Sequence, residues 1–421
     1  MCKTTSQSLL RLLVFCASLL VIPLTVLGQS PFSSVKMEVT LNQEGAEWKA
    51  EAKFTAQGQE FANPVRDLKV SDNNNISFTV NIGGADVRFV GKLGDDKLGG
   101  TLEAFERNAK IANGTWGLTR QKESSPAKGL TGKWSGTFAA QIIGEQASDP
   151  NFDTHVARPA YVKNHPRVLF DEAHNNFHTT TGRYKPFADL IANDGYQVTA
   201  NTEKFSKQTL EGYDVLVISN ALGPRGQRNT AAFTDEECDA VRDWVRAGGA
   251  LLFIADHAPM GAAAEILSKR FGVDMSKGYT GDPANNDKQS KELTQLVFSR
   301  ENKLLGEHAI TSGRNAGERI NRVITFTGQS LRGPEGSVAI LRLADTAVDK
   351  LPGVEKEVSA AGRSQGVALK LGKGRVVVLA EAAMLTAQVS GEGEKFGMNV
   401  PGNDDRQLAL NIMHWLSGLL K

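Results

Sequence analysis

The sequence predicts an α/β fold with a doubly wound, flavodoxin-like parallel sheet, preceded by an all-β antiparallel meander or small barrel. Apolar and polar side chains alternate over residues 35–120, as in strands with one buried face. From residue 167 onward, short apolar runs alternate with amphipathic helical segments, which is typical of a parallel sheet covered by helices. The length of 421 residues also exceeds what one hydrophobic core usually supports, so we expect two domains.

Residues 1–28 have the pattern of a secretory signal peptide. Lys3 and Arg11 precede an apolar run over 12–24, and small or tolerated residues over 25–28 fit a cleavage site. The alternative is a retained membrane anchor, but a spanning helix needs roughly 20 apolar residues. We therefore expect an exported protein, periplasmic or extracellular, without a stable membrane span after cleavage.

The charge balance and the number of cysteines limit the expected partners and disulfide bonds. The 48 Lys and Arg residues nearly balance the 47 Asp and Glu residues, so no overall field favours a nucleic-acid partner. Of the 3 cysteines, Cys2 and Cys16 fall in the expected signal peptide and only Cys238 remains. No intrachain disulfide is then possible, and the fold must depend on its hydrophobic cores.

Residues 29–123 are predicted to form the antiparallel β domain. Its clearest alternating runs are 37–41, 48–54, 76–80 and 87–91, and Gly, Asn and Asp clusters separate them. The segments 89–94, 98–102 and 114–120 loosely resemble strands of small lipocalin-like barrel modules in exported bacterial proteins. Residues 132–138 resemble the opening strand of such a module. They either close the barrel or begin a linker over 124–160.

Residues 161–421 are predicted to form the α/β domain. Its buried strands are expected at 168–170, 215–218, 251–254 and 376–379. Thr234 and Glu237 have the spacing of a capping box, and Gly248 follows the helix that they would start. Cys238 lies on the apolar face of this helix, so we expect a core thiol and not a nucleophile.

The motifs of this second domain resemble the class I glutamine amidotransferase-like superfamily. Residues 213–220 and 248–257 carry the strand endings, and residues 168–175 look like the opening strand of its uncharacterised DUF4350-type bacterial domains. The segments 372–381 and 403–406 fit the same group, so the likeness covers roughly 165–420. It implies a doubly wound domain.

The catalytic cysteine of those amidotransferases has no counterpart here. The position of their nucleophile elbow reads Ala255-Asp256-His257-Ala258-Pro259, which offers no thiol or hydroxyl, and no His-x-Glu follows the strand at 376–379. We therefore expect no glutaminase activity.

Ligands of doubly wound sheets bind beyond the carboxyl ends of the strands, so the polar residues that follow each strand are the candidate site. The candidate catalytic residues are Asp256, His257 and His174. The candidate ligand-binding residues are Asp171, Glu172, Asn176, His178, Asn220 and Glu381. A long excursion over residues 274–303 is expected to cross the same edge.

Three interpretations of this edge remain open. The first is a binding site for a small polar ligand or an envelope partner, with no cofactor identified. The second is a metal-assisted hydrolase that uses Asp171, His174, Asp256 and His257, because carboxylates and imidazoles can hold a divalent metal and its water. The third is structural, with the carboxylates capping loops and the histidines satisfying buried polar groups.

Overall fold

The computed structural model describes residues 34–421 except 57–58, 72–73, 83–84, 107–108, 122–128, 143–145, 225–229, 291 and 391–392. The predicted signal peptide, residues 1–28, lies outside the described residues. The chain divides into two compact units, one reaching Ala147 and the other containing nearly all of the remainder from Ser148.

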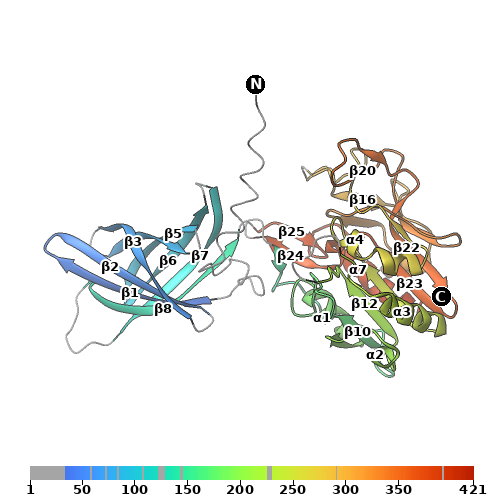
Figure 1. Ribbon diagram of the computed structural model, residues 1–421, viewed down its shortest axis with the longest axis horizontal. Helices are drawn as coiled ribbons and strands as arrows, with labels where there is room; N and C mark the ends of the chain where they lie inside the picture. Colours follow the sequence, from blue (N-terminus) through green and yellow to red (C-terminus); the bar gives the residue numbers. More distant parts are fainter. Residues whose placement is uncertain are drawn as a thin grey trace. The chain divides into compact units, whose positions relative to one another are not determined.

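The first unit is a closed barrel of eight antiparallel strands (Figure 1). Its strands are β1 (Ser34–Glu44), β2 (Glu47–Ala56), β3 (Gln59–Ser71), β4 (Asn75–Ile82), β5 (Ala85–Gly94), β6 (Lys97–Glu106), β7 (Ala109–Arg120) and β8 (Gly132–Ile142). β8 pairs with both β7 and β1 and so closes the barrel. Residues 132–138 therefore belong to the barrel, which answers the question that the sequence left open.

Aromatic side chains fill the barrel interior. Phe78 and Phe89 stack with ring centroids 4.9 Å apart, and the Trp116 ring meets both of them edge-on. Trp134 is fully buried, and its indole Nε1 donates to the Leu130 carbonyl at 2.9 Å. The tryptophans at 116 and 134 therefore serve as core, because each buries a large apolar surface and satisfies its single polar donor.

The second unit is built on a nine-stranded mixed sheet. Its strands are β10 (Arg167–Asp171), β11 (Gln197–Asn201), β12 (Val215–Ser219), β13 (Ala250–Ile254), β14 (Asp274–Met275), β18 (Leu331–Arg332), β19 (Val338–Arg342), β22 (Ser364–Leu371) and β23 (Gly374–Leu379). The first five in space, β11-β10-β12-β13-β23, are parallel. The next strand, β22, is antiparallel to β23 because a tight turn at Gly372, with φ of +60°, joins the two strands. The predicted parallel sheet is thus only part of a mixed one.

Helices cover both faces of the parallel strands. They are α1 (Lys185–Asn193), α2 (Lys207–Leu210), α3 (Asp235–Ala247), α4 (Met260–Ala263), α5 (Glu265–Arg270), α6 (Ala309–Ser312) and α7 (Asp405–Leu416), with 3-10 turns η2 (Ala316–Glu318) and η3 (Ala383–Leu385). The predicted capping box of α3 is confirmed, since Glu237 N donates to Thr234 Oγ1 and Thr234 N donates to Glu237 Oε2. Over the described residues, strand outweighs helix, so the molecule is mostly β.

Small strands fill the long excursions between β13 and β23 and after β23. They are β15 (Tyr279–Gly281), β16 (Leu296–Ser299), β17 (Arg322–Thr325), β20 (Val348–Lys350), β21 (Val358–Ser359), β24 (Ala387–Ser390) and β25 (Lys395–Gly397), and β9 (Gln146–Ser148) lies at the unit boundary. Over the described ranges, none of the helices has both the length and the hydrophobicity needed to cross a membrane.

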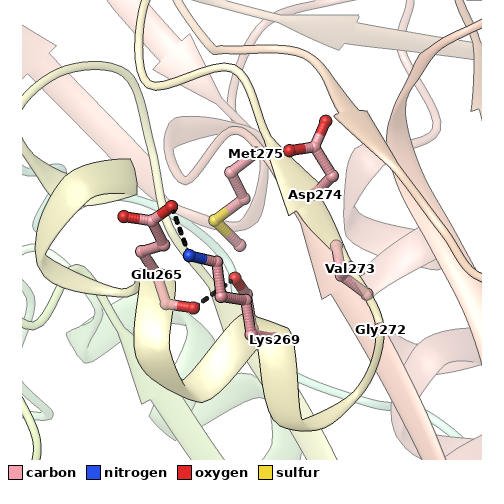
Figure 2. Close-up of a pocket in the computed structure, with 7 residues that line it drawn as sticks. Glu265, Lys269, Gly272, Val273, Asp274 and Met275 are labelled. Carbon is pink, nitrogen blue, oxygen red and sulfur yellow. Dashed lines mark hydrogen bonds and ion pairs between the residues drawn. The ribbon is translucent and has the colours of Figure 1, made fainter.

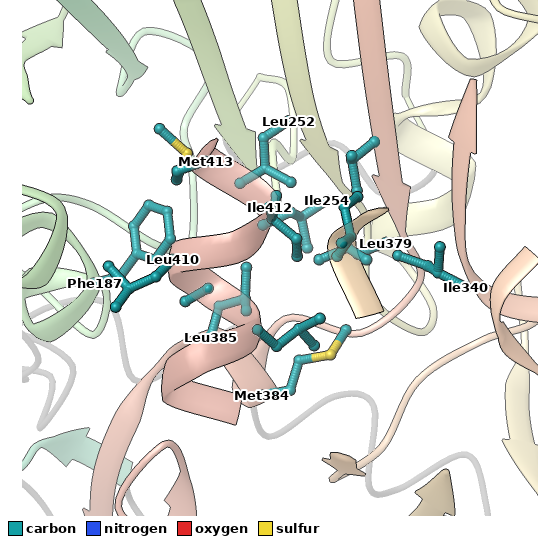
Figure 3. Close-up of a cluster of buried hydrophobic side chains, with 14 of the residues drawn as sticks. Phe187, Leu252, Ile254, Ile340, Leu379, Met384, Leu385, Leu410, Ile412 and Met413 are labelled. Carbon is teal, nitrogen blue, oxygen red and sulfur yellow. The ribbon is translucent and has the colours of Figure 1, made fainter. Parts of the chain in front are cut away.

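Alternate side chains of the four parallel strands β10, β12, β13 and β23 enter two different cores. Leu252 and Ile254 of β13 pack on one face, together with Leu379 and the α7 side chain Ile412 (Figure 3). On the other face, Phe253 joins a cluster that contains residues of α3 and α5. The strands are therefore buried on both sides, and their polar residues are confined to the strand ends.

Candidate functional site

Three neighbouring strands end together and place polar residues at one edge of the sheet. Ile254 of β13 is in register with Ser219 of β12 and Leu379 of β23. The residues that come next are therefore side by side: Asn220 follows β12, and Asp256 and Glu381 each lie two residues beyond their strand. Asn220 is held in place by its backbone N, which donates to the Ile254 carbonyl at 3.0 Å.

Asp171 and His174 form a buried pair with a partner that the sequence did not suggest. His174 Nδ1 lies 2.8 Å from Asp171 Oδ1, and His174 Nε2 lies 2.8 Å from Glu237 Oε1. The imidazole is packed between the rings of Phe205 and Phe233, each with its centroid at 4.7 Å. Both ring nitrogens face carboxylates, which only accept, so both must carry hydrogen.

His174 therefore links the loop after β10 to the start of α3 through ion pairs with Asp171 and Glu237. Burial alone would lower the pKa of His174, but the hydrogen bonds and charges of Asp171 and Glu237 raise it above its ordinary value. Burial likewise opposes ionisation of Glu237, yet the Thr234 amide and His174 lower its pKa. No ring nitrogen of His174 is left for a ligand, so the geometry favours a structural role for the Asp171–His174–Glu237 group.

Of three other predicted residues from the loop after β10, two are hydrogen-bonded within the protein and the third, His178, is buried with an unpartnered Nδ1. Asn176 Nδ2 donates to Asp171 Oδ2 at 2.9 Å, and Glu172 Oε1 accepts from both the amide and the hydroxyl of Thr180 at 2.7 Å. His178 is 3% exposed, and burial, with a smaller effect from Arg183, lowers its pKa to about 3. A neutral His178 therefore belongs to the interior at any physiological pH.

Asp256 and Glu381 form an acidic pair at the ends of β13 and β23. Burial raises the pKa of Asp256 to about 7, against the lowering effects of the His257 amide and the Asn220 side chain. Burial and the charge of Asp256 raise the pKa of Glu381 to about 8, although its two oxygens accept from the Ala383 and Met384 amides at 2.6 and 2.8 Å. Burial outweighs these hydrogen bonds, so the pKa of both carboxyls lies above the ordinary value.

His257 also has a ring nitrogen that no described residue binds. Its Nδ1 lies 2.8 Å from the Ala258 carbonyl oxygen, which can only accept, so Nδ1 must carry the hydrogen. In the neutral ring, Nε2 then keeps its lone pair, and it makes no hydrogen bond to any described residue. The side chain is partly exposed, and its backbone N donates to Asp256 Oδ1 at 2.8 Å. His257 therefore presents one hydrogen-bond acceptor next to the acidic pair.

Two residues that the sequence analysis missed hold the turn after β13. Tyr279 of β15 stacks on the His257 ring, with centroids 4.7 Å apart, and its hydroxyl donates to the Ala258 carbonyl at 3.3 Å. Gln329, which precedes β18, donates through Nε2 to the Ala255 and Asp256 carbonyls at 2.9 and 2.8 Å. Tyr279 lies in the expected excursion over 274–303. No sequence signal pointed to Gln329, because it is distant in sequence and has no motif around it.

A small pocket of about 200 Å³ lies elsewhere, beside α5 and β14 (Figure 2). Glu265 bonds Lys269 across its rim, and Met275 lines it. Within the described part of the chain, no three His, Cys, Asp or Glu side chains are grouped so as to hold a metal ion. In particular, His174 is turned toward Asp171 and Glu237, and not toward His257.

Comparisons with known proteins assign no family. No family model and no curated protein matches the chain. Among solved structures, the N-terminal domain of mmIFT52 is similar at 14% identity, covering 60% of this chain and 97% of that one, with a TM-score of 0.42. A cytoplasmic protein from Salmonella typhimurium LT2 has 13% identity, coverage of 60% and 97%, and a TM-score of 0.32. A beta-galactosidase from Rahnella sp. R3 has 11% identity, coverage of 60% and 31%, and a TM-score of 0.31. None of these likenesses is strong enough to support an argument about activity.

Proposed function

We propose that the second unit binds a small polar ligand at the carboxyl ends of β12, β13 and β23, with His257 Nε2 as the anchoring acceptor. The observation that carries this proposal is the contact between His257 Nδ1 and the Ala258 carbonyl, because in the neutral ring it leaves the lone pair on Nε2, which has no hydrogen bond to a described residue. The ligand would supply a hydroxyl, amide or ammonium hydrogen to this atom. Strand ends of this kind are where open α/β sheets bind their ligands.

We propose further that this unit has a flavodoxin-like fold of the class I glutamine amidotransferase-like type, in the DUF4350-type group. The spatial order β11-β10-β12-β13-β23 and the helices on both faces support this proposal. The position of the nucleophile elbow would be the turn after β13, which carries Asp256 and His257 in place of cysteine. Cys238 offers no substitute, because it is buried in α3 and burial raises its pKa to about 12.

Export to the periplasm or the cell exterior is part of the same proposal. The apolar run over 12–24, with Lys3 and Arg11 before it, is its support. An envelope partner on the barrel unit would fit this location. The proposal includes neither a nucleic-acid partner nor a cofactor.

A second candidate function is hydrolysis with His257 as general base. The Nδ1 contact favours it, because in the neutral ring it leaves a lone pair on Nε2, and a general base must accept a proton from water or substrate. The metal-assisted version with Asp171, His174, Asp256 and His257 has less support, because Asp171 and His174 already bind each other.

The test is a thermal-shift screen of the full chain with polyols, sugars, amino acids and small amides. A compound that raises the melting temperature of the wild type should fail to do so for His257→Phe, which keeps a ring against Tyr279 but has no nitrogen. His165→Phe is the matched control, because His165 also bonds a backbone carbonyl through Nδ1 but lies before β10, at the other end of the strand. Equal stabilisation of His257→Phe by every active compound would contradict the proposal. Turnover of ester or amide probes by the wild type, and not by His257→Phe, would support the hydrolase instead.

A further inference from the structure

Gln329 is a buried side chain whose amide nitrogen and amide oxygen are both hydrogen-bonded. Its two Nε2 hydrogens go to the carbonyls of Ala255 and Asp256, and its Oε1 accepts from Lys277 N at 2.7 Å. The side chain is 0% exposed. Both donor hydrogens of this buried amide have partners, and its oxygen accepts one hydrogen bond.

Those contacts fall on the segment that presents His257. Ala255 and Asp256 are the two residues between the end of β13 and His257. Their carbonyls accept hydrogen bonds from Gln329. From the other side, the Asp256 amide donates to Asn220 Oδ1 at 2.9 Å. The backbone of Asp256 is therefore held at both its N–H and its C=O by side-chain amides from two distant loops.

The same glutamine also joins the turn to the segment that carries Tyr279. Lys277 N, bound by Gln329 Oε1, lies two residues before Tyr279, and the backbone of Gln329 itself donates to the Ala380 carbonyl next to Glu381 at 3.0 Å. Gln329 thus connects the ends of β13 and β23 with the start of β15.

We infer that Gln329 is a positioning residue, which holds the 255–258 turn so that His257 keeps Nδ1–H on the Ala258 carbonyl and offers Nε2 as acceptor. This inference rests on the proposed function, because it concerns the same ring atom. Without the hydrogen bonds from Gln329 to this turn, the His257 ring would lose its fixed contact with the Ala258 carbonyl and adopt the mixture of tautomers found in water.

The test is the ¹⁵N spectrum of histidine-labelled full-length chain, with the His257 signal assigned by its loss in His257→Phe. Gln329→Glu keeps the size of the side chain but sets an oxygen against two carbonyl oxygens. Gln365→Glu is the control, because Gln365 is equally buried but accepts from Thr325 Oγ1 at 2.7 Å and does not contact the turn. Far-ultraviolet circular dichroism checks that each variant is folded, and Gln329→Met provides a second variant if Gln329→Glu is not.

The expected result is the Nδ1–H tautomer in the wild type and in Gln365→Glu, with a mixed or Nε2–H signal in the Gln329 variant. A wild-type ring in the Nε2–H form would overturn the proposed function itself. A wild-type ring in the Nδ1–H form that persists unchanged in the folded Gln329 variants would overturn only the role of Gln329.

Discussion

Replacement of Asp256 by asparagine should make the stability of the protein less dependent on pH. The raised pKa of Asp256, about 7, means that the folded protein keeps a proton on this carboxyl that the unfolded chain releases near its ordinary value of 3.8. Between these values the native state binds more protons than the unfolded state, so the free energy of unfolding falls as pH rises. One such proton corresponds to about 1.4 kcal/mol for each pH unit. Asparagine keeps an oxygen for the His257 amide but has no proton to retain.

The assay is urea denaturation at pH 5, 5.5, 6 and 6.5, a window between the ordinary pKa of an aspartate and the raised pKa of Asp256. Over this range of 1.5 units, the wild type should lose up to about 2 kcal/mol more than Asp256→Asn. Loss of the Asp256 charge also lowers the pKa of Glu381, which changes the slope in the same direction. Asp189→Asn, at an exposed site on α1, is the control and should keep the wild-type slope. Identical slopes in the wild type and Asp256→Asn would refute the reasoning.

Other substitutions test the structural parts of the account. His174→Gln should lower the free energy of unfolding by about 3–5 kcal/mol, because it leaves two buried carboxylates without their cation. A loss below about 1 kcal/mol in urea denaturation would contradict the positive charge assigned to His174. Thr234→Ala should cost about 1 kcal/mol through loss of the α3 cap, measured in the same way, and an unchanged midpoint would argue against the capping box. Gly136→Ala should destabilise the barrel by about 1–3 kcal/mol, since its new Cβ would lie 2.1 Å from the Gly117 carbonyl oxygen. Gly117→Ala is the control and should be tolerated, because its new Cβ meets nothing within 4 Å. Equal melting temperatures of the two variants would count against the closed barrel.

Local sequence patterns predicted the elements that depend on local interactions. The capping box at Thr234 and the buried thiol of Cys238 were predicted correctly, the first from the spacing of Thr234 and Glu237 and the second from helix periodicity. The buried strands β10, β12, β13 and β23 were recognisable from their apolar runs, whereas the buried strand β22, which begins with polar residues, was missed. The edge strand β11 was missed, since its exposed residues give it no apolar run.

The contacts within the candidate site depend on residues far apart in sequence and could not be derived in the same way. The strand-end rule gathered Asn220, Asp256 and Glu381 at one edge, where the register of the sheet does place them. It could not reveal that the capping residue Glu237 also binds His174, 63 residues away in sequence. Nor could it find Gln329, whose contribution depends only on tertiary packing.

The proposed function depends on His257 Nε2 as an accessible hydrogen-bond acceptor at the carboxyl edge of the sheet. The most direct measurement is the rate of diethyl pyrocarbonate modification of each histidine near neutral pH, followed by peptide mass spectrometry, because this reagent acylates an accessible unprotonated ring nitrogen. We expect rapid modification of His257, while His174 and His178, which are 5% and 3% exposed, stay unmodified in the folded protein. Failure of His257 to react, or reaction of His174 at the same rate, would rule out this role of His257.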